Sequence, residues 1–329
     1  MTKKIAILGS GSWASALAKI IHENVDTLYW YVREAEIIES LQLHSRNSLY
    51  VSDISYNIDR LYVSDNINEI VDLADIIIFC VPSKFIISLC GSITSDLSHK
   101  ELVTAIKGME PVEITLISEY LKKRFGVNDS QTAVISGPCH AEEVALEHLS
   151  YLTIGSQNQD LATEVSGFLS TYYIRTCTSH DVAGIEYASV LKNIMALATG
   201  IAIGLGYGDN FISVLISNAI QEMQRFINTA NPLARDINDS VYLGDLLVTA
   251  YSQFSRNRTF GTMIGRGYSV QSAELQMNMI AEGYYGAHCI TQINQKLNVD
   301  MPITLSVYNI LYNKISPSME FKILAKNLR

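Results

Sequence analysis

The sequence is poor in proline, in cysteine and in charge. Among 329 residues there are 6 prolines and 5 cysteines, and only 17% of the residues are charged. The cysteines include no C-x-x-C pair, which argues against a disulfide framework and against a structural zinc site. This pattern suits a reducing compartment, so we expect a cytoplasmic protein without a bound metal.

Long apolar segments and an excess of positive charge are also missing. The charge-free stretch 193–208 is shorter than the about 20 apolar residues that cross a bilayer, and glycines interrupt it. The amino terminus passes at once into a strand pattern, which leaves no room for a signal peptide. The net charge of −9 argues against nucleic acid as the main partner. We therefore expect a soluble protein with a small-molecule substrate and no membrane insertion.

Apolar runs alternate with helical segments in the first half of the chain. The runs predict strands at residues 4–9, 27–32, 75–81, 102–106, 132–136 and 151–156. They are mostly continuous, as expected where helices cover both faces of a parallel sheet. Further helices are predicted at residues 187–205, 211–228 and from 273 to the end. The predicted class is α/β: a Rossmann-like doubly wound sheet in residues 1–183, followed by an all-helical domain in residues 184–329.

A glycine turn follows the first predicted strand. In GSGSWA, Gly9 permits the tight turn, Gly11 lets a pyrophosphate approach the backbone, and Ala14 is small enough for the next helix to pack on the strand. The start of that helix offers N–H groups to the phosphates. The strand–turn–helix context therefore predicts a dinucleotide site.

The residues expected to contact the adenosine ribose do not decide between NAD and NADP. Near the end of the second predicted strand, where an acidic residue is usual, the sequence has Arg33 followed by Glu34. Arginine can hold a 2′-phosphate, whereas glutamate can take the acidic role. NAD and NADP both remain open at this point.

One lysine interrupts an otherwise apolar helix. In ASVLKNIMALATG (188–200), Lys192 is the only formal charge between Tyr187 and Gly206. Burial lowers the pKa of an amine toward neutrality, which suits proton exchange with a ketone oxygen; a charged amine would instead polarise the carbonyl. A lysine that reaches solvent from a helix end is the alternative. Composition alone does not separate these readings.

Eight segments, taken in order, resemble the bacterial-type NAD(P)-dependent glycerol-3-phosphate dehydrogenases nearly end to end. They are GSGSWASALA (9–18), VPS (81–83), KG (107–108), SGPCHAEEVA (136–145), GIEYASVLKNIMA (184–196), LGDLLVT (243–249), SQFSRNRTFG (252–261) and AEG (281–283). The resemblance implies a Rossmann domain, a helical substrate domain and a homodimer. It also implies interconversion of dihydroxyacetone phosphate and sn-glycerol 3-phosphate by hydride transfer with NAD(P)H, which supplies glycerol phosphate for phospholipid synthesis.

The resemblance assigns roles to individual residues, with Lys192 as the proton donor and acceptor. The substrate contacts that it implies are Lys107, Gly137, Cys139, Lys192, Asp245, Ser255, Arg256 and Asn257. With the glycine turn and Arg33 included, the expected cofactor contacts are Gly9, Gly11, Ser12, Trp13, Arg33, Lys107, Ala141, Arg256, Ile280 and Glu282. We expect His140 to pack or to support the site rather than to act as an acid.

The sequence departs from the family pattern at four places. Ala14 stands where glycine is usual in the fingerprint, which the motif tolerates. Cys139 stands where serine or threonine is common, and Ser217-Asn218 stands where many members have Thr-Arg. Tyr284-Tyr285 replaces smaller residues near the expected nicotinamide end. None of these changes removes a catalytic group.

Two other functions are compatible with parts of the pattern. A two-domain hydroxyacid dehydrogenase shares the Rossmann half and a catalytic lysine, but its substrate site binds a carboxylate. A non-catalytic NAD(P)-binding sensor would not need Lys107, Lys192, Asp245 and Arg256 together. An absorbance assay with NADH and NADPH against dihydroxyacetone phosphate and oxo acids separates the three.

Overall fold

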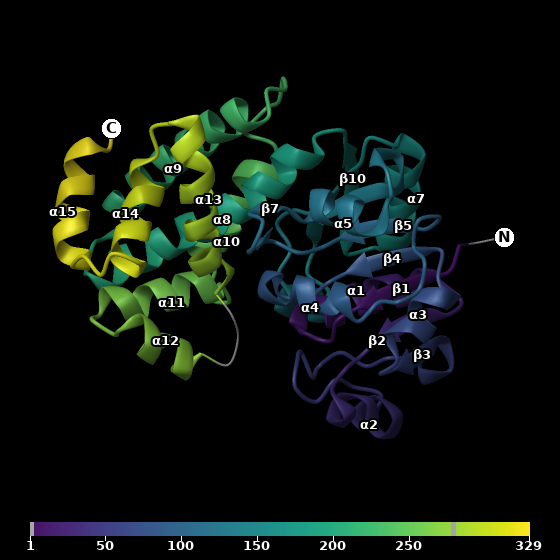
Figure 1. Cartoon of the computed structure of the whole chain (residues 1–329). Coiled ribbons are helices and arrows are strands. Elements are labelled where there is room, and N and C mark those ends of the chain that lie inside the picture. Colours follow the sequence, from purple (N-terminus) through teal and green to yellow (C-terminus); the bar gives the residue numbers. More distant parts are fainter. Residues whose placement is uncertain (1–2, 278–280) are drawn as a thin grey trace. The chain divides into compact units, whose positions relative to one another are not determined.

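The computed structural model describes residues 3–277 and 281–329, and the chain forms two compact units (Figure 1). The first unit comprises Met1–Ile106 and Thr115–Val182. The second comprises Lys107–Ile114 and Ala183–Arg329, so a short segment from the middle of the first half belongs with the helices of the second.

Among the described residues, the first unit is built on an eight-stranded sheet of order β10-β9-β8-β5-β4-β1-β2-β3. Neighbouring strands are parallel except for β8 and β9. The strands are β1 (Ile5–Leu8), β2 (Leu28–Tyr31), β3 (Leu61–Ser64), β4 (Ile76–Phe79), β5 (Glu101–Thr104), β8 (Thr132–Ser136), β9 (Ser150–Gly155) and β10 (Ile174–Ser179). The predicted Rossmann-like sheet is thus confirmed, with the edge strands β3 and β10 in addition.

Helices cover both faces of this sheet. Ile5 and Ile7 of β1 pack into one apolar cluster with α1, α2, α6 and α7, whereas Ala6 and Leu8 pack into a second cluster with α3, α4 and α5. The continuous apolar run of β1 is therefore explained by burial on both sides. The helices of this unit are α1 (Ser12–Asn24), α2 (Ala35–His44), α3 (Ile67–Leu73), α4 (Ile86–Gly91), α5 (Ile117–Phe125), α6 (Ala141–Ala145) and α7 (Gln159–Leu169). Shorter elements of this unit are the 3₁₀ turns Ile58–Arg60, Ser83–Phe85 and Asp129–Gln131 and the strand β7 (Thr115–Leu116), whereas β6 (Met109–Glu110) belongs to the second unit.

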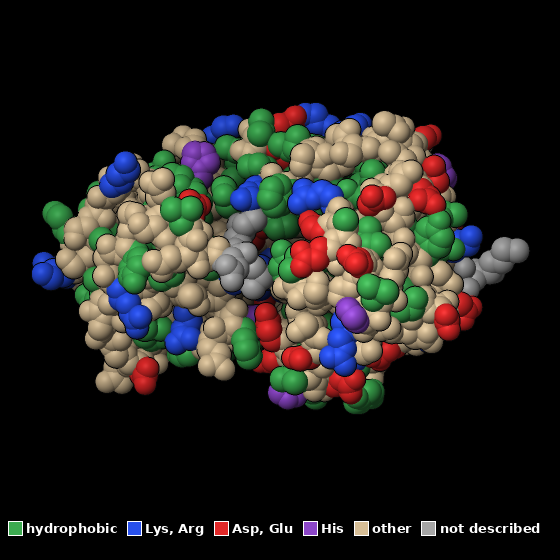
Figure 2. Space-filling model, turned by 90° about the horizontal axis from the view of Figure 1, so that it is seen from below, with side chains coloured by type: hydrophobic (Ala, Val, Ile, Leu, Met, Phe, Trp, Pro, Cys, Tyr) green, Lys and Arg blue, Asp and Glu red, His purple; other side chains and the backbone are tan. Residues whose placement is uncertain are grey.

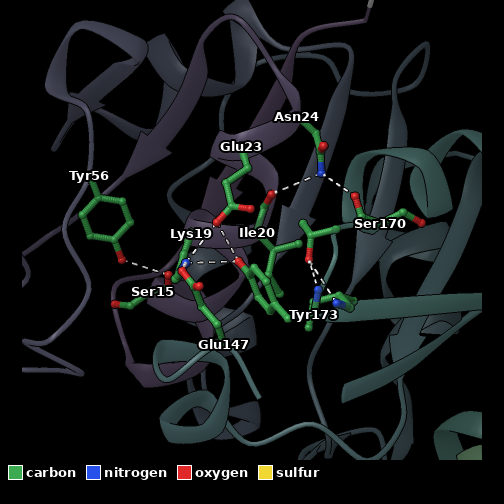
Figure 3. A network of polar contacts seen from close by, with 11 residues as sticks. Ser15, Lys19, Ile20, Glu23, Asn24, Tyr56, Glu147, Ser170 and Tyr173 are labelled. Carbon is green, nitrogen blue, oxygen red and sulfur yellow. Dashed lines mark hydrogen bonds and ion pairs between the residues drawn. The ribbon is translucent and has the colours of Figure 1, made fainter. Parts of the chain in front are cut away.

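A polar network holds α1, the helix after the glycine turn, against the segments around α6 and β10 (Figure 3). Lys19 Nζ lies 3.0 Å from a carboxylate oxygen of Glu23, 2.8 Å from one of Glu147, and over the ring of Tyr173. The Tyr173 hydroxyl donates to Glu23, which closes the network. One turn further on, the Asn24 amide donates to two backbone carbonyls near the end of α7. These contacts fix the carboxyl-terminal half of α1.

The second unit is mainly helical, as predicted. It contains α8 (Val182–Gly204), α9 (Asp209–Ala230), a π-helical turn (Ser240–Gly244), α10 (Asp245–Tyr251), α11 (Arg256–Gly265), α12 (Val270–Gln276), α13 (Glu282–Leu297), α14 (Pro302–Leu311) and α15 (Pro317–Asn327). The predicted helical stretch from residue 273 onward is thus divided among four helices.

Helix α8 lies at the centre of the second unit. Among the described residues it is the one helix long and apolar enough to cross a membrane, but 83% of its apolar window is buried by the protein. Its backbone nearly touches α11: a Cβ on Gly200 would lie 2.1 Å from the carbonyl oxygen of Arg258, and one on Gly261 would lie 2.2 Å from that of Leu197. Such contacts are those of a core helix.

A buried carboxylate joins two other helices of this unit. Glu222 of α9 accepts hydrogen bonds from the backbone N–H groups of Ile303 and Thr304 and from the Thr304 hydroxyl, at 2.7–2.9 Å. It thereby caps the start of α14, where N–H groups lack partners within the helix. Burial raises the pKa of Glu222 to about 7.

Acidic and basic side chains are interspersed on the face drawn in Figure 2. The coloured residues of that face form no extended basic surface. This distribution agrees with the net charge of −9.

Candidate active site

Two lysines share one carboxylate in the second unit. Lys192 of α8 forms a buried ion pair with Oδ1 of Asp245, the first residue of α10. Lys107 Nζ lies 3.4 Å from Oδ2 of the same aspartate. Lys192 is 4% exposed and Asp245 is 1% exposed, so neither head group reaches bulk solvent as a surface lysine would. The structure therefore excludes the alternative in which Lys192 extends into water.

This arrangement makes the Lys192 amine an unusually weak base. Removal from water lowers its pKa, and the Lys107 ammonium lowers it further, whereas Asp245 opposes the shift; the resulting pKa is about 7. An amine with such a pKa is present in both protonation states at neutral pH, which is the condition for efficient general acid–base exchange.

A chain of buried amides runs beside this cluster. The Asn193 side chain donates to the Lys107 backbone carbonyl at 2.9 Å, and its oxygen accepts from the Asn257 amide at 2.9 Å. The Asn257 oxygen in turn accepts from the backbone N–H of Gly283 at 2.8 Å. The chain connects the Lys107 segment, α8, α11 and the start of α13. Asn257, expected to contact substrate, thus also has a structural role, and Asn193 is a supporting residue that the sequence did not reveal.

Ser255 and Arg256 lie at the amino terminus of α11. Ser255 is buried, and its hydroxyl caps the helix by accepting from the backbone N–H of Arg258 at 3.3 Å. Arg256 is the first helical residue. A helix start with an adjacent arginine suits a phosphate group.

The glycine turn of the first unit has the conformation that the fingerprint predicts. Gly9 has φ +127°, and a Cβ there would lie 2.3 Å from the carbonyl oxygen of Cys80, so no other residue fits. A Cβ on Gly11 would meet nothing within 4 Å, which leaves open space at the start of α1. Ser12 is the first residue of α1 and Trp13 the second.

Side chains from distant positions hold this turn. Trp30 of β2 donates from Nε1 to the Gly9 carbonyl at 2.7 Å. Asn47, which is fully buried after α2, donates to the Ser10 carbonyl and to the Ser15 hydroxyl, both at 2.9 Å. Sequence reasoning missed both residues, because neither belongs to a motif around the glycines.

The remaining predicted contacts of the first unit lie between β8 and α6. Gly137 has φ +129°, and a Cβ there would lie 2.7 Å from the Tyr151 carbonyl oxygen. Cys139 and Ala141 are buried, and His140 is the N-cap residue of α6. Within the described chain, the His140 side chain makes no capping hydrogen bond to α6, and its supporting role stays a prediction.

Ile280 lies outside the described residues, and its predicted cofactor contact stays a prediction. Glu282, the other predicted contact of this segment, is the first residue of α13. Tyr284 stacks on Tyr312 with ring centroids 4.9 Å apart, so this departure from the family is absorbed by packing between α13 and the residue after α14. Asn218 exchanges hydrogen bonds with the backbone of Arg329.

Comparison with known proteins agrees with this geometry. The family model for the amino terminus of NAD-dependent glycerol-3-phosphate dehydrogenase matches residues 4–162, and the model for its carboxyl terminus matches residues 181–322. The chain belongs to this family.

Individual members of the NAD-dependent glycerol-3-phosphate dehydrogenase family align with almost the whole chain. A glycerol-3-phosphate dehydrogenase [NAD(P)+] of Lysinibacillus sphaericus is 34% identical over 330 residues, covering 99% of this chain and 97% of the relative. One from Clostridium botulinum is 31% identical over 317 residues, covering 96% and 95%. The crystal structure of glycerol-3-phosphate dehydrogenase from Coxiella burnetii superimposes with a TM-score of 0.90 at 27% identity, covering 99% of both chains.

The cofactor class of the dehydrogenase family, NAD(P), fits the residues present. The open space at Gly11 gives a pyrophosphate access to the backbone, and Gly11 offers no side chain that would cap α1 in its place. The start of a 13-residue helix provides the partial positive charge that stabilises phosphates. The residues that would hold this part of the cofactor are Gly9, Gly11, Ser12 and Trp13.

Proposed function

We propose that this chain interconverts dihydroxyacetone phosphate and sn-glycerol 3-phosphate, with NAD(P)H as the hydride source and Lys192 as the proton donor and acceptor. The observation that carries the proposal is the buried cluster in which Lys192 and Lys107 share Asp245. Such a cluster has a net positive charge while Lys192 is protonated, and the pKa of that amine is lowered to about 7. Both properties are required where a ketone becomes an alkoxide.

The chain's own residues account for the movement of the proton. The bound nicotinamide supplies the hydride that reduces the ketone carbon. Protonated Lys192 donates its proton to the carbonyl oxygen as negative charge develops there, and Lys107 stabilises that charge electrostatically. Asp245 holds the Lys192 amine in place and accepts a hydrogen bond from it. In the reverse direction the neutral amine removes the proton of the substrate hydroxyl.

Phosphate recognition is assigned to the start of α11. Arg256 supplies two parallel N–H donors for phosphate oxygens, and the helix start with Ser255 adds backbone donors. Asn257 supports this site through its bonds to Asn193 and Gly283. Gly137 and Cys139 are assigned to the substrate as well; Ala141, Arg33, Ile280 and Glu282 are assigned to the cofactor.

The same family membership suggests the domain bounds, the location and the oligomeric state. We place the cofactor domain in residues 1–183 and the substrate domain in residues 184–329, with Lys107–Ile114 packing among the helices of the substrate domain. We also propose a cytoplasmic homodimer that supplies glycerol phosphate for phospholipid synthesis. The support for these statements is the family membership and the scattered cysteines.

A spectrophotometric assay tests the activity. Purified protein is mixed with NADH or NADPH and with dihydroxyacetone phosphate, and loss of absorbance at the nicotinamide band is followed. Dihydroxyacetone and 2-oxo and 3-oxo acids serve as comparison substrates. Turnover that requires the phosphate supports the proposal. Turnover of an oxo acid alone would indicate a hydroxyacid dehydrogenase, and binding of the cofactor without turnover of any substrate would indicate a sensor.

A further inference from the structure

The end of β2 brings an acidic side chain onto the glycine turn. β1 and β2 are parallel neighbours with Leu8 opposite Tyr31, and the backbone N–H of Gly9 bonds to the Tyr31 carbonyl at 3.2 Å. The residues that follow the two strands therefore lie side by side. Here the Ser10 hydroxyl, in the middle of the turn, donates to Oε2 of Glu34 at 2.5 Å.

The other oxygen of this carboxylate is also occupied. Arg33 Nη2 lies 3.0 Å from Oε1 of Glu34. The Arg33 side chain is 72% exposed, whereas the Glu34 side chain is 31% exposed, so the carboxylate lies nearer the turn and the guanidinium nearer solvent. The hydrogen bond from Ser10, together with those from the Glu34 backbone and from Arg33, outweighs partial burial and lowers the pKa of Glu34, which keeps it ionised at neutral pH.

The charge of this region disfavours an additional anion. Arg33, Glu34 and Asp65, which follows β3, all act electrostatically on the Tyr31 hydroxyl at the end of β2. The Arg33 guanidinium is already paired with Glu34, and the Asp65 carboxylate adds a second negative charge near the end of β2. A site for a 2′-phosphate needs a surplus of positive charge, whereas a site for a free ribose 2′-hydroxyl needs a carboxylate acceptor.

We infer that Glu34 is a specificity-determining residue that makes this chain prefer NAD over NADP. The inference rests on the proposed dehydrogenase function, and it assigns to Glu34 the ribose and to Arg33 the support of Glu34. When the pyrophosphate lies on the start of α1, the adenosine ribose lies beside the end of β2. Glu34 accepts a hydrogen bond from the 2′-hydroxyl there and repels a 2′-phosphate.

Equilibrium binding tests the inference without turnover. The dissociation constants of NADH and NADPH are measured by calorimetry on the full chain. Those of 5′-AMP and 2′,5′-ADP, which differ only in the 2′-phosphate, are measured as fragments that carry only the adenosine end. We expect NADH to bind at least about tenfold more tightly than NADPH. The repulsion between like charges near a protein surface is large enough to change a dissociation constant by more than about tenfold. 5′-AMP should bind more tightly than 2′,5′-ADP for the same reason.

Two matched variants locate the effect. Glu34→Gln keeps the shape of the side chain and removes its charge, and we expect it to reduce the preference by about tenfold, mainly by strengthening the binding of NADPH. Glu36→Gln makes the same change of charge on the exposed face of α2 and should leave the ratio unchanged. Circular dichroism checks that both variants fold.

The outcomes distinguish this inference from the proposed function. If the wild-type protein binds NADPH as tightly as NADH, or more tightly, the inference is wrong, although the dehydrogenase function still stands. If Glu34→Gln leaves the preference unchanged while the protein folds, Glu34 is not its cause. If neither dinucleotide binds, the dehydrogenase function itself fails, and the inference fails with it.

Discussion

Lys19 and Lys192 both form ion pairs with carboxylates, but the ratio of amines to carboxylates differs between the two clusters. Lys19 in the first unit is one ammonium that faces two carboxylates, Glu23 and Glu147 (Figure 3). Asp245 in the second unit is one carboxylate that serves two amines, those of Lys192 and Lys107. A surplus of acceptors suits an ion pair that joins segments of the fold. A surplus of amines in a buried place favours the loss of a proton, which is what acid–base chemistry requires.

The largest expected effect is that of Lys192→Met. This change removes the titrating amine and keeps an unbranched side chain in α8. We expect kcat for reduction of dihydroxyacetone phosphate to fall by about 10²–10⁴-fold, since that is the usual contribution of general acid–base catalysis. Circular dichroism and calorimetric binding of NADH should remain close to wild type. Turnover within a few fold of wild type would remove Lys192 from the mechanism.

Asp245→Asn should have the next largest effect. The change removes a carboxylate that raises the pKa of Lys192, so this pKa falls below about 7. Each unit of further decrease lowers the protonated fraction about tenfold at neutral pH, and ketone reduction should slow by that factor. The pH at which reduction loses half its rate should move to a lower value. An unchanged pH profile would show that Asp245 does not set the protonation of Lys192.

Lys19→Met should have the smallest effect on activity. It removes two partly exposed ion pairs and a cation–π contact, which together stabilise the fold by about 1–2 kcal/mol. We expect Tm to fall by about 2–6 °C and kcat to stay unchanged. A loss of kcat as large as that of Asp245→Asn would contradict the contrast between the two lysines.

The sequence predicted the parts of the fold that local patterns determine. The runs at β1 and β4 are apolar on both faces, and the glycines follow β1 directly, so their order already indicates the sheet and the turn. β3 and β10 were missed because they are edge strands with partly exposed residues, and their apolar patterns are correspondingly weak. The sequence singled out the one lysine in α8 but left its burial and its exposure to solvent equally open, and the structure decided for burial.

The supporting contacts of the site were not readable from the sequence. Asn47 lies 32 positions after Ser15, and Asn193 lies 64 positions before Asn257. Such pairs form only after the elements that carry them have packed, and one sequence contains no signal for them. For the same reason, the bonds of Asn257 to Asn193 and Gly283 became visible only in the structure.

Titration of the Lys192 amine tests the central claim most directly. The protein is labelled with ¹³C at lysine Cε, the Lys192 resonance is assigned from its absence in Lys192→Met, and its chemical shift is followed from pH 5 to pH 10. A lysine with an ordinary pKa would titrate near 10.5, above this range. We predict a midpoint near 7, with the amine protonated below it and neutral above it. A Lys192 resonance that stays constant up to pH 9 would contradict the account.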